Sequence, residues 1–137
     1  MMIVFVNPDK ALRETFMQTF HQTSKVFCFG DMFEAYKWIK RHDKSPDVII
    51  TEVDLQDPSG LQTLKFLETK SKLKETKLIA FTPEPPAKEE ISLVVSEGAD
   101  AVFSTPTLLQ DISSYLKFLE SSSTSATGGT RKSSEKK

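Results

Sequence analysis

Short apolar runs alternate with helical patterns along most of this chain. The apolar runs predict five β-strands, at residues 3–6, 25–29, 48–51, 78–81 and 101–103. After each run, apolar residues recur every three or four positions, which predicts helices over residues 10–23, 31–41, 60–73, 88–97 and 107–119. The first run is apolar throughout, so we expect that strand to be buried on both faces of a sheet.

The alternation of strands and helices at short spacing defines the expected fold class. It predicts an α/β protein with a parallel sheet that is covered by helices on both faces. Right-handed crossovers then give a doubly wound sandwich. Residues 1–120 are expected to form this single domain. From residue 121 the composition changes to Ser, Thr and Gly, so residues 121–137 are predicted to be a disordered tail or linker.

Charge is distributed unevenly between these two parts. The chain carries a formal net charge of -1, and residues 121–137 contribute +3 of it, which leaves -4 on the rest. An acidic body argues against nucleic-acid binding by the globular domain, whereas the basic end is either a solvated tail or a polyanion-binding arm. The apolar runs are too short for a signal peptide or a membrane span, so we expect a cytoplasmic protein. The single cysteine, Cys28, lies in a strand pattern and is expected to be a core residue.

The stretch from Pro46 to Gly60 places an acidic residue where chemistry is expected. Glu52 follows the third apolar run, and a loop of Asp, Pro, Ser and Gly residues then leads into a helix. In open α/β sheets, ligands bind outside the carboxyl ends of the strands. Glu52 is therefore the first candidate for a working residue.

Further landmarks stand around this stretch in a definite order. They are Pro46-Asp47 before the third strand, the spacing from Glu52 to Gly60, Phe81-Thr82 ending the fourth strand, Gly98-Ala99-Asp100 before the fifth, Thr105-Pro106 after it, and Arg13 in the first helix. With them, residues 2–119 resemble the receiver domain of two-component response regulators. The resemblance implies a flavodoxin-like (βα)5 fold with strand order 2-1-3-4-5, and a site at the carboxyl edge of the first, third and fifth strands.

A typical receiver accepts a phosphoryl group on an aspartate beside a bound Mg²⁺, and this sequence departs from that pattern at most positions. The matching residues are Glu52 at the phosphoacceptor, Asn7 and Pro8 at the metal-binding acidic pair, Thr82 at the phosphoryl contact, Thr105 at the charge-neutralising lysine and Val102 at the switch aromatic. Of these, Thr82 alone fits the family pattern. Without the metal or the lysine, charge developing on a phosphoryl group is uncompensated. We therefore expect no enzyme activity, no metal and no cofactor.

The leading prediction is a phosphorylation-independent pseudo-receiver that acts as a protein-interaction module in bacterial signal transduction. One alternative is a phosphoacceptor that uses Glu52 or Asp54. Another is a flavodoxin-like small-molecule binder, although Asn7-Pro8-Asp9 stands where a Gly-rich or Ser/Thr-rich phosphate loop belongs. Glu52 itself is either a fixed mimic of the phosphorylated state, hydrogen-bonded to Thr82, or a vestigial carboxylate.

Two surfaces are candidates for binding a protein partner. The second helix is too rich in apolar residues for all of them to face the sheet. Ala35 and Ile39 fit the core stripe, which leaves Phe33, Tyr36 and Trp38 either as a partner site or folded over the sheet edge. The second surface comprises the fourth helix, fifth strand and fifth helix, a possible homodimer contact, where three residues fall outside the core spacing: Leu93, Tyr115 and Phe118.

Overall fold

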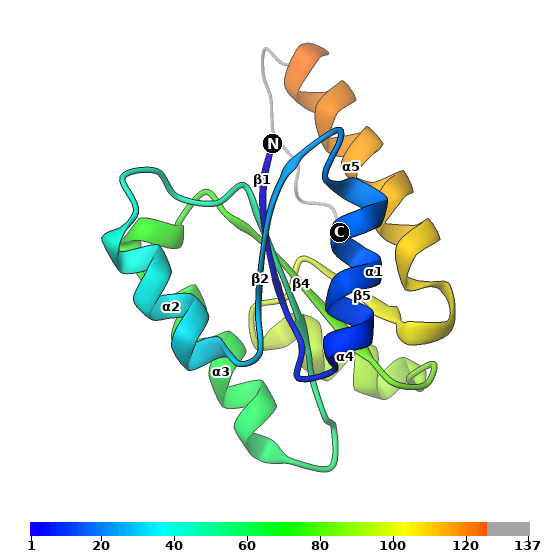
Figure 1. The fold of residues 1–137 in the computed structure, drawn as a ribbon. Coiled ribbons are helices and arrows are strands. Elements are labelled where there is room, and N and C mark those ends of the chain that lie inside the picture. Colours follow the sequence, from blue (N-terminus) through cyan, green and yellow to red (C-terminus); the bar gives the residue numbers. More distant parts are fainter. Residues whose placement is uncertain (126–137) are drawn as a thin grey trace.

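The computed structural model describes residues 1–125, which form a five-stranded parallel sheet of order β2-β1-β3-β4-β5 (Figure 1). The strands are β1 Met2–Val6, β2 Lys25–Phe29, β3 Val48–Glu52, β4 Lys77–Thr82 and β5 Ala101–Ser104. Each expected strand is present, and the predicted fold class and strand order are confirmed.

Helices cover both faces of this sheet. They are α1 Lys10–Phe20, α2 Met32–Arg41, α3 Pro58–Glu68, α4 Lys88–Ser96 and α5 Leu108–Ser125. Buried residues of α1 and α5 join one apolar cluster on the sheet, while those of α2, α3 and α4 join clusters on the opposite face. The arrangement is therefore a three-layer sandwich, with α1 and α5 on one side (Figure 1).

The central strand β1 explains why the first apolar run has no polar positions. Ile3 and Phe5 belong to the cluster under α1 and α5, whereas Val4 and Val6 belong to the cluster under α2 and α3. Successive side chains of a strand point to opposite faces, so a strand covered on both sides must be apolar throughout. The prediction of burial on both faces is confirmed.

The third helix differs from the expectation of residues 60–73. It begins at Pro58, because the Oδ1 atom of Asp57 accepts a hydrogen bond from the Ser59 amide at 3.0 Å and proline suits the first helical turn. It ends at Glu68, and a separate 3₁₀ turn, η1 Ser71–Leu73, follows. That turn buries Leu73 in the core. The apolar period of the sequence therefore extends past the end of the helix, which is why the predicted helix was too long.

The ends of two other helices can be explained from single residues. The first helix stops at Phe20 rather than at residue 23, because the Phe20 carbonyl accepts from the amides of Thr23 and Ser24 in a closing turn. Gly98 follows α4 with a φ of 122°, a backbone conformation that favours glycine, as expected for a helix C-cap.

The last helix extends past the predicted domain boundary at residue 120. It continues through Ser and Thr residues to Ser125. These residues are only modest helix formers, but extending an existing helix needs no new nucleus. The rest of the predicted tail, residues 126–137, lies outside the described residues. Within residues 1–125, no helix is both long and apolar enough to cross a membrane.

Two aspartates hold the beginnings of neighbouring strands together. The Oδ2 atom of Asp47 accepts from the Met2 amide at 2.7 Å, while the Asp47 amide donates to the Met2 carbonyl. Asp100 repeats this arrangement with Leu78, at 2.8 Å to its Oδ2 atom. The landmarks Pro46-Asp47 and Gly98-Ala99-Asp100 therefore have a structural role in joining β3 to β1 and β5 to β4.

Candidate functional site

The carboxyl edge of the sheet brings together the residues that the sequence singled out there. Asn7, Glu52, Thr82 and Thr105 follow or end β1, β3, β4 and β5 respectively. The strands are parallel, with Val6 opposite Thr51 and Glu52 opposite Phe81, so these ends lie at one level. The structure therefore places these four residues together at the carboxyl edge of the sheet.

Both polar atoms of the Asn7 side chain form hydrogen bonds within the protein. Its side chain is buried, its Nδ2 atom donates to the Oε1 atom of Glu52 at 3.0 Å, and its Oδ1 atom accepts from the Asp9 amide at 2.7 Å. The Nη1 atom of Arg13 donates to the Asn7 carbonyl at 2.7 Å. Arg13 thus helps to fix the loop after β1, which gives a physical reason for its place in the first helix.

These residues do not fit a magnesium ion. Mg²⁺ needs oxygen ligands in near-octahedral geometry, usually with one or two carboxylates. The Asn7 oxygen is neutral and already accepts one hydrogen bond, and Pro8 is exposed and has no side-chain oxygen. Within residues 1–125, no group of three or more His, Cys, Asp or Glu side chains is close enough to hold a metal.

The hydroxyls of the two threonines of the site also donate hydrogen bonds to backbone carbonyls. The hydroxyl of buried Thr82 donates to the Glu84 carbonyl at 2.6 Å, and the Thr105 hydroxyl donates to the Thr82 carbonyl at 3.3 Å. Glu52 pairs instead with Asn7. The hydrogen bond from Thr82 to Glu52, on which the phosphomimic hypothesis depends, is therefore replaced by these contacts.

An open depression of about 630 Å³ lies at this edge and is strongly acidic. Four carboxylates line it, from Asp31, Glu52, Asp54 and Asp57, and no lysine or arginine does so among the described residues. The alternative acceptor Asp54 is exposed, and its Oδ1 atom accepts from the Gln56 amide at 2.9 Å. Such a surface presents negative charge to an incoming phosphoryl group, without a lysine or arginine among the described residues that line it.

Sequence reasoning did not place Asp31 and Asp57 in this depression. Each caps the N-terminus of a helix, Asp31 through the Glu34 amide and Asp57 through the Ser59 amide. The hydrogen bonds from Ser59 lower the pKa of the Asp57 carboxyl. The signal was present in the sequence, because helices that follow parallel strands begin at the same edge of the sheet as the site.

Val102 stands where receivers carry a switch aromatic, and here it is part of the packing. It lies half-buried in β5 opposite Ala80 and contacts the apolar cluster that includes Val53 and Val94. An aliphatic side chain has no polar tip that could report a change at the sheet edge. The site and α4 are thus not linked by a rotating ring.

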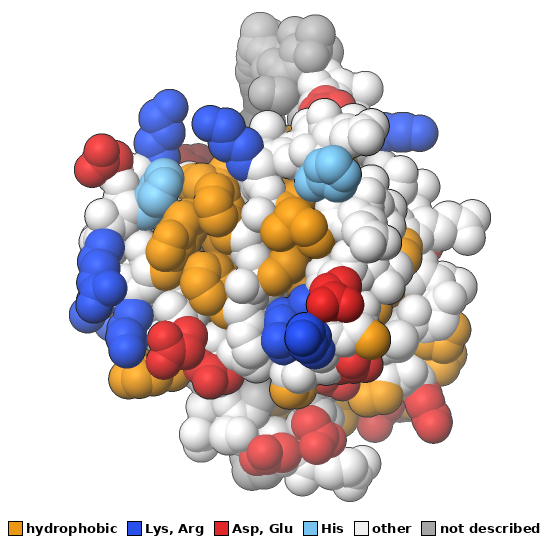
Figure 2. Space-filling model, viewed as in Figure 1, with side chains coloured by type: hydrophobic (Ala, Val, Ile, Leu, Met, Phe, Trp, Pro, Cys, Tyr) orange, Lys and Arg blue, Asp and Glu red, His pale blue; other side chains and the backbone are white. Residues whose placement is uncertain are grey.

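The three aromatic residues predicted on α2 have different environments. Ala35 and Ile39 are fully buried, as expected. Trp38 is half-buried over the sheet edge, with its ring 4.5 Å from Phe27. Tyr36 turns the other way and meets Phe66 of α3 edge to face at 5.3 Å, while Phe33 is 71% exposed. Figure 2 shows hydrophobic side chains between α2 and β2, with basic and acidic side chains around them.

On α4 and α5, two of the three predicted surface residues are exposed. Leu93 is 45% exposed and Phe118 is 60% exposed. Tyr115 is half-buried and packs against Phe103 of β5 at a ring distance of 6.1 Å. The homodimer expected on this surface remains a prediction.

Tyr115 should make the stability of the protein depend on alkaline pH. Burial, helped by the charge of Asp100, raises the pKa of Tyr115 from 10 to about 12. Between these values the unfolded phenol ionises while the folded one does not, so the free energy of unfolding should fall as pH rises from 10 to about 12. Urea denaturation across this range should show a shallower fall for Tyr115→Phe. Parallel curves for the two proteins would contradict the assignment.

Cys28 is a partly buried neighbour of the core, in line with its expected structural role. It packs against the cluster that contains Phe5 and Phe16. Burial raises the pKa of its thiol, and the positive charge of Arg13 acts in the opposite direction. A raised pKa disfavours the reactive thiolate.

Comparison with solved structures places this architecture among receiver domains. A response regulator from Thermotoga maritima superposes with a TM-score of 0.72 at 16% identity, covering 87% of this chain and 96% of its own. A two-component response regulator from Clostridium difficile gives 0.72 at 17% identity, with 86% and 93% covered. The chemotaxis response regulator CheY4 of Vibrio cholerae gives 0.68 at 22% identity, with 81% and 94% covered.

These likenesses establish the fold of the chain. Residues 1–125 have the flavodoxin-like receiver fold of response regulators, as the sequence landmarks predicted. In sequence, neither a protein-family model nor a curated protein matches the chain.

Proposed function

We propose that this protein is a phosphorylation-independent pseudo-receiver that acts in signal transduction by binding a protein partner. The receiver fold, shared with response regulators, supports the signalling role. The altered carboxyl edge of the sheet supports independence from phosphorylation.

The hydrogen bond between Asn7 and Glu52 is the observation that carries this proposal. In a working receiver, the corresponding side chains hold a metal and accept a phosphoryl group. Here the Asn7 amide donates a hydrogen bond to one oxygen of Glu52 at 3.0 Å, and both polar atoms of that amide take part in hydrogen bonds. Thr105 supplies no positive charge, and removing one such charge from a reaction site typically costs orders of magnitude in rate.

Exposed apolar side chains support a role in binding a partner. Phe33, Leu93 and Phe118 are all large and lie at the surface. The two aromatic ones, Phe33 and Phe118, are of a type that commonly anchors protein interfaces. A domain that has lost the phosphoryl chemistry but kept the fold and such surfaces is suited to recognition.

Intact-mass spectrometry after incubation with Mg²⁺ and acetyl phosphate tests the loss of phosphorylation. We expect no gain of a phosphoryl group, because the metal site and the counter-charge are both missing. A receiver domain with a complete site, treated in parallel, serves as the positive control.

A stoichiometric gain of one phosphoryl group would overturn the proposal. The variants Glu52→Gln and Asp54→Asn would then show which carboxylate accepts the group. Loss of the gain in one variant alone would identify that residue as the phosphoacceptor.

A further inference from the structure

A groove between α2 and α3 combines an aromatic floor with a basic rim. It encloses about 610 Å³. We call it the α2–α3 groove and define it by the six residues that carry the argument: Phe33, Tyr36 and Phe66, with Lys37, Lys40 and Lys70. The edge-to-face contact of Tyr36 with Phe66 joins the two helices across its floor.

The floor offers apolar surface to a ligand. Phe33 is 71% exposed and Phe66 is 43% exposed, although both are large aromatic side chains. Leaving such area in water is unfavourable, and an apolar group that covers it removes this area from water. The groove is therefore suited to receive a large apolar side chain.

The rim gives the groove a positive charge. The Nζ atom of Lys37 lies 5.0 Å from the ring centre of Phe33, that of Lys40 lies 5.8 Å from Tyr36, and that of Lys70 lies 4.2 Å from Phe66. No carboxylate is among the described residues that line the groove. The rim should therefore attract acidic groups and repel basic ones.

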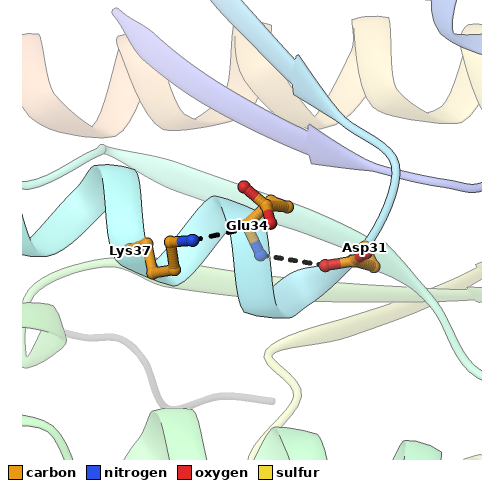
Figure 3. A network of polar contacts seen from close by, with 3 residues as sticks. All are labelled: Asp31, Glu34 and Lys37. Atoms are coloured by element: carbon orange, nitrogen blue, oxygen red, sulfur yellow. Dashed lines mark hydrogen bonds and ion pairs between the residues drawn. The ribbon is translucent and has the colours of Figure 1, made fainter.

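These charges are largely free to act on a ligand. Lys37 has an exposed ion pair with Glu34 at 3.6 Å, and Glu34 itself donates its amide to the capping Asp31 (Figure 3). Exposed pairs of this kind contribute little. Within residues 1–125, neither Lys40 nor Lys70 forms an ion pair.

We propose that the α2–α3 groove binds an acidic segment of a partner protein that carries a large apolar side chain. The inference rests on the proposed function, and it names the chemistry of the partner. Acidic groups of the segment pair with the lysines of the rim, and its apolar side chain covers Phe33 and Phe66. The end of this chain is an unsuitable occupant, because residues 121–137 carry a charge of +3.

A protein segment fits this groove better than a single-stranded nucleic acid. Base recognition by such sites depends on free aromatic faces on which bases stack. Here the rings of Tyr36 and Phe66 are packed edge to face against each other. The remainder of the chain also carries a net charge of -4, which repels a long polyanion more strongly than a short segment whose few acidic groups lie at the rim.

Selection from a random peptide library displayed on phage tests this specificity even though the partner is unidentified. With the full-length chain immobilised, enriched peptides should be rich in Asp and Glu and should contain Trp, Phe or Leu. The proposal is wrong if nothing is enriched, or if the enriched peptides are neutral or basic.

An enriched peptide carrying a fluorescent label then locates the site by fluorescence anisotropy. Phe66→Ala and Lys70→Glu should each weaken binding about tenfold or more, the loss expected of a central interface residue. Ile91→Ala is the matched control for Phe66, because the two side chains are 39% and 43% exposed and Ile91 lies on α4 outside the groove. Lys88→Glu is the control for the charge reversal, since Lys88 is exposed on α4 outside the groove.

The remaining outcomes separate this inference from the proposed function. Loss of binding in Leu93→Ala with retained binding in Phe66→Ala would contradict the α2–α3 groove as the binding site. The proposed function in protein binding would then still stand. Displacement of the peptide by oligothymidine would indicate that the groove binds nucleic acid and not a protein segment. A dimer in analytical ultracentrifugation that Phe66→Ala dissociates would identify a second copy as the occupant. Phosphorylation in the mass experiment would contradict the proposed function alone.

Discussion

Replacing Phe5 by alanine should lower the free energy of unfolding by about 3–5 kcal/mol, the range measured for large aromatic side chains in protein cores. Phe5 is fully buried in the central strand β1. Its ring stacks on Phe16 of α1 at 4.1 Å and on Phe81 of β4 at 5.8 Å, with interplanar angles of 9° and 5°. The substitution therefore opens a cavity at the point where a helix and two strands meet.

Urea denaturation followed by far-UV circular dichroism measures this loss. Phe118→Ala is the control, because Phe118 is 60% exposed on α5 and its loss should change the free energy of unfolding by no more than about 0.5 kcal/mol. A loss below about 1 kcal/mol for Phe5→Ala would contradict the packing described for this cluster.

Replacing Asp100 by alanine should lower the free energy of unfolding by about 1–3 kcal/mol, because it leaves a buried amide without its acceptor. Leu78 is 5% exposed, and its amide donates to the Oδ2 atom of Asp100 at 2.8 Å. This contact lies at the beginning of β4, where no residue of β5 supplies a backbone acceptor for the Leu78 amide. The asparagine variant keeps an acceptor oxygen and should lose distinctly less stability.

Two measurements distinguish the hydrogen bond of Asp100 from its charge. Asp43→Ala removes the same charge at an exposed position and should be nearly neutral in urea denaturation. Both Asp100 variants should lower the pKa of Tyr115, which the Asp100 charge helps to raise. Equal losses of stability in the alanine and asparagine variants would show that the hydrogen bond is unimportant.

The fold could be predicted from the sequence because its determinants are local and repeated. Each strand is a short apolar run, and each following helix shows its own apolar period. The boundaries were less accurate, as the start of α3 at Pro58 illustrates. There the cap that Asp57 provides determined where the helix begins, whereas the apolar period of the sequence starts at a later residue.

The candidate site was predicted in its composition and in its place on the sheet. Asn7, Glu52, Thr82 and Thr105 meet at the carboxyl edge because parallel strands end at the same side. The hydrogen bonds among them could not be predicted. Whether Thr82 donates to Glu52 or to the Glu84 carbonyl depends on the path of the loop after β4, which no periodic pattern specifies.

The sequence by itself determined the order of strands and helices, the apolar faces and the residue types that stand at the carboxyl edge of the sheet. These are properties of single positions and of short repeats. The tertiary structure decided which surface residues act together. Lys70 follows α3 and lies over the ring of Phe66, but only the packing of α3 against α2 brings Phe66 to Tyr36 and forms the groove. The tertiary structure also decided the hydrogen-bond partner of Glu52, because the fold places the Asn7 amide 3.0 Å from its carboxylate.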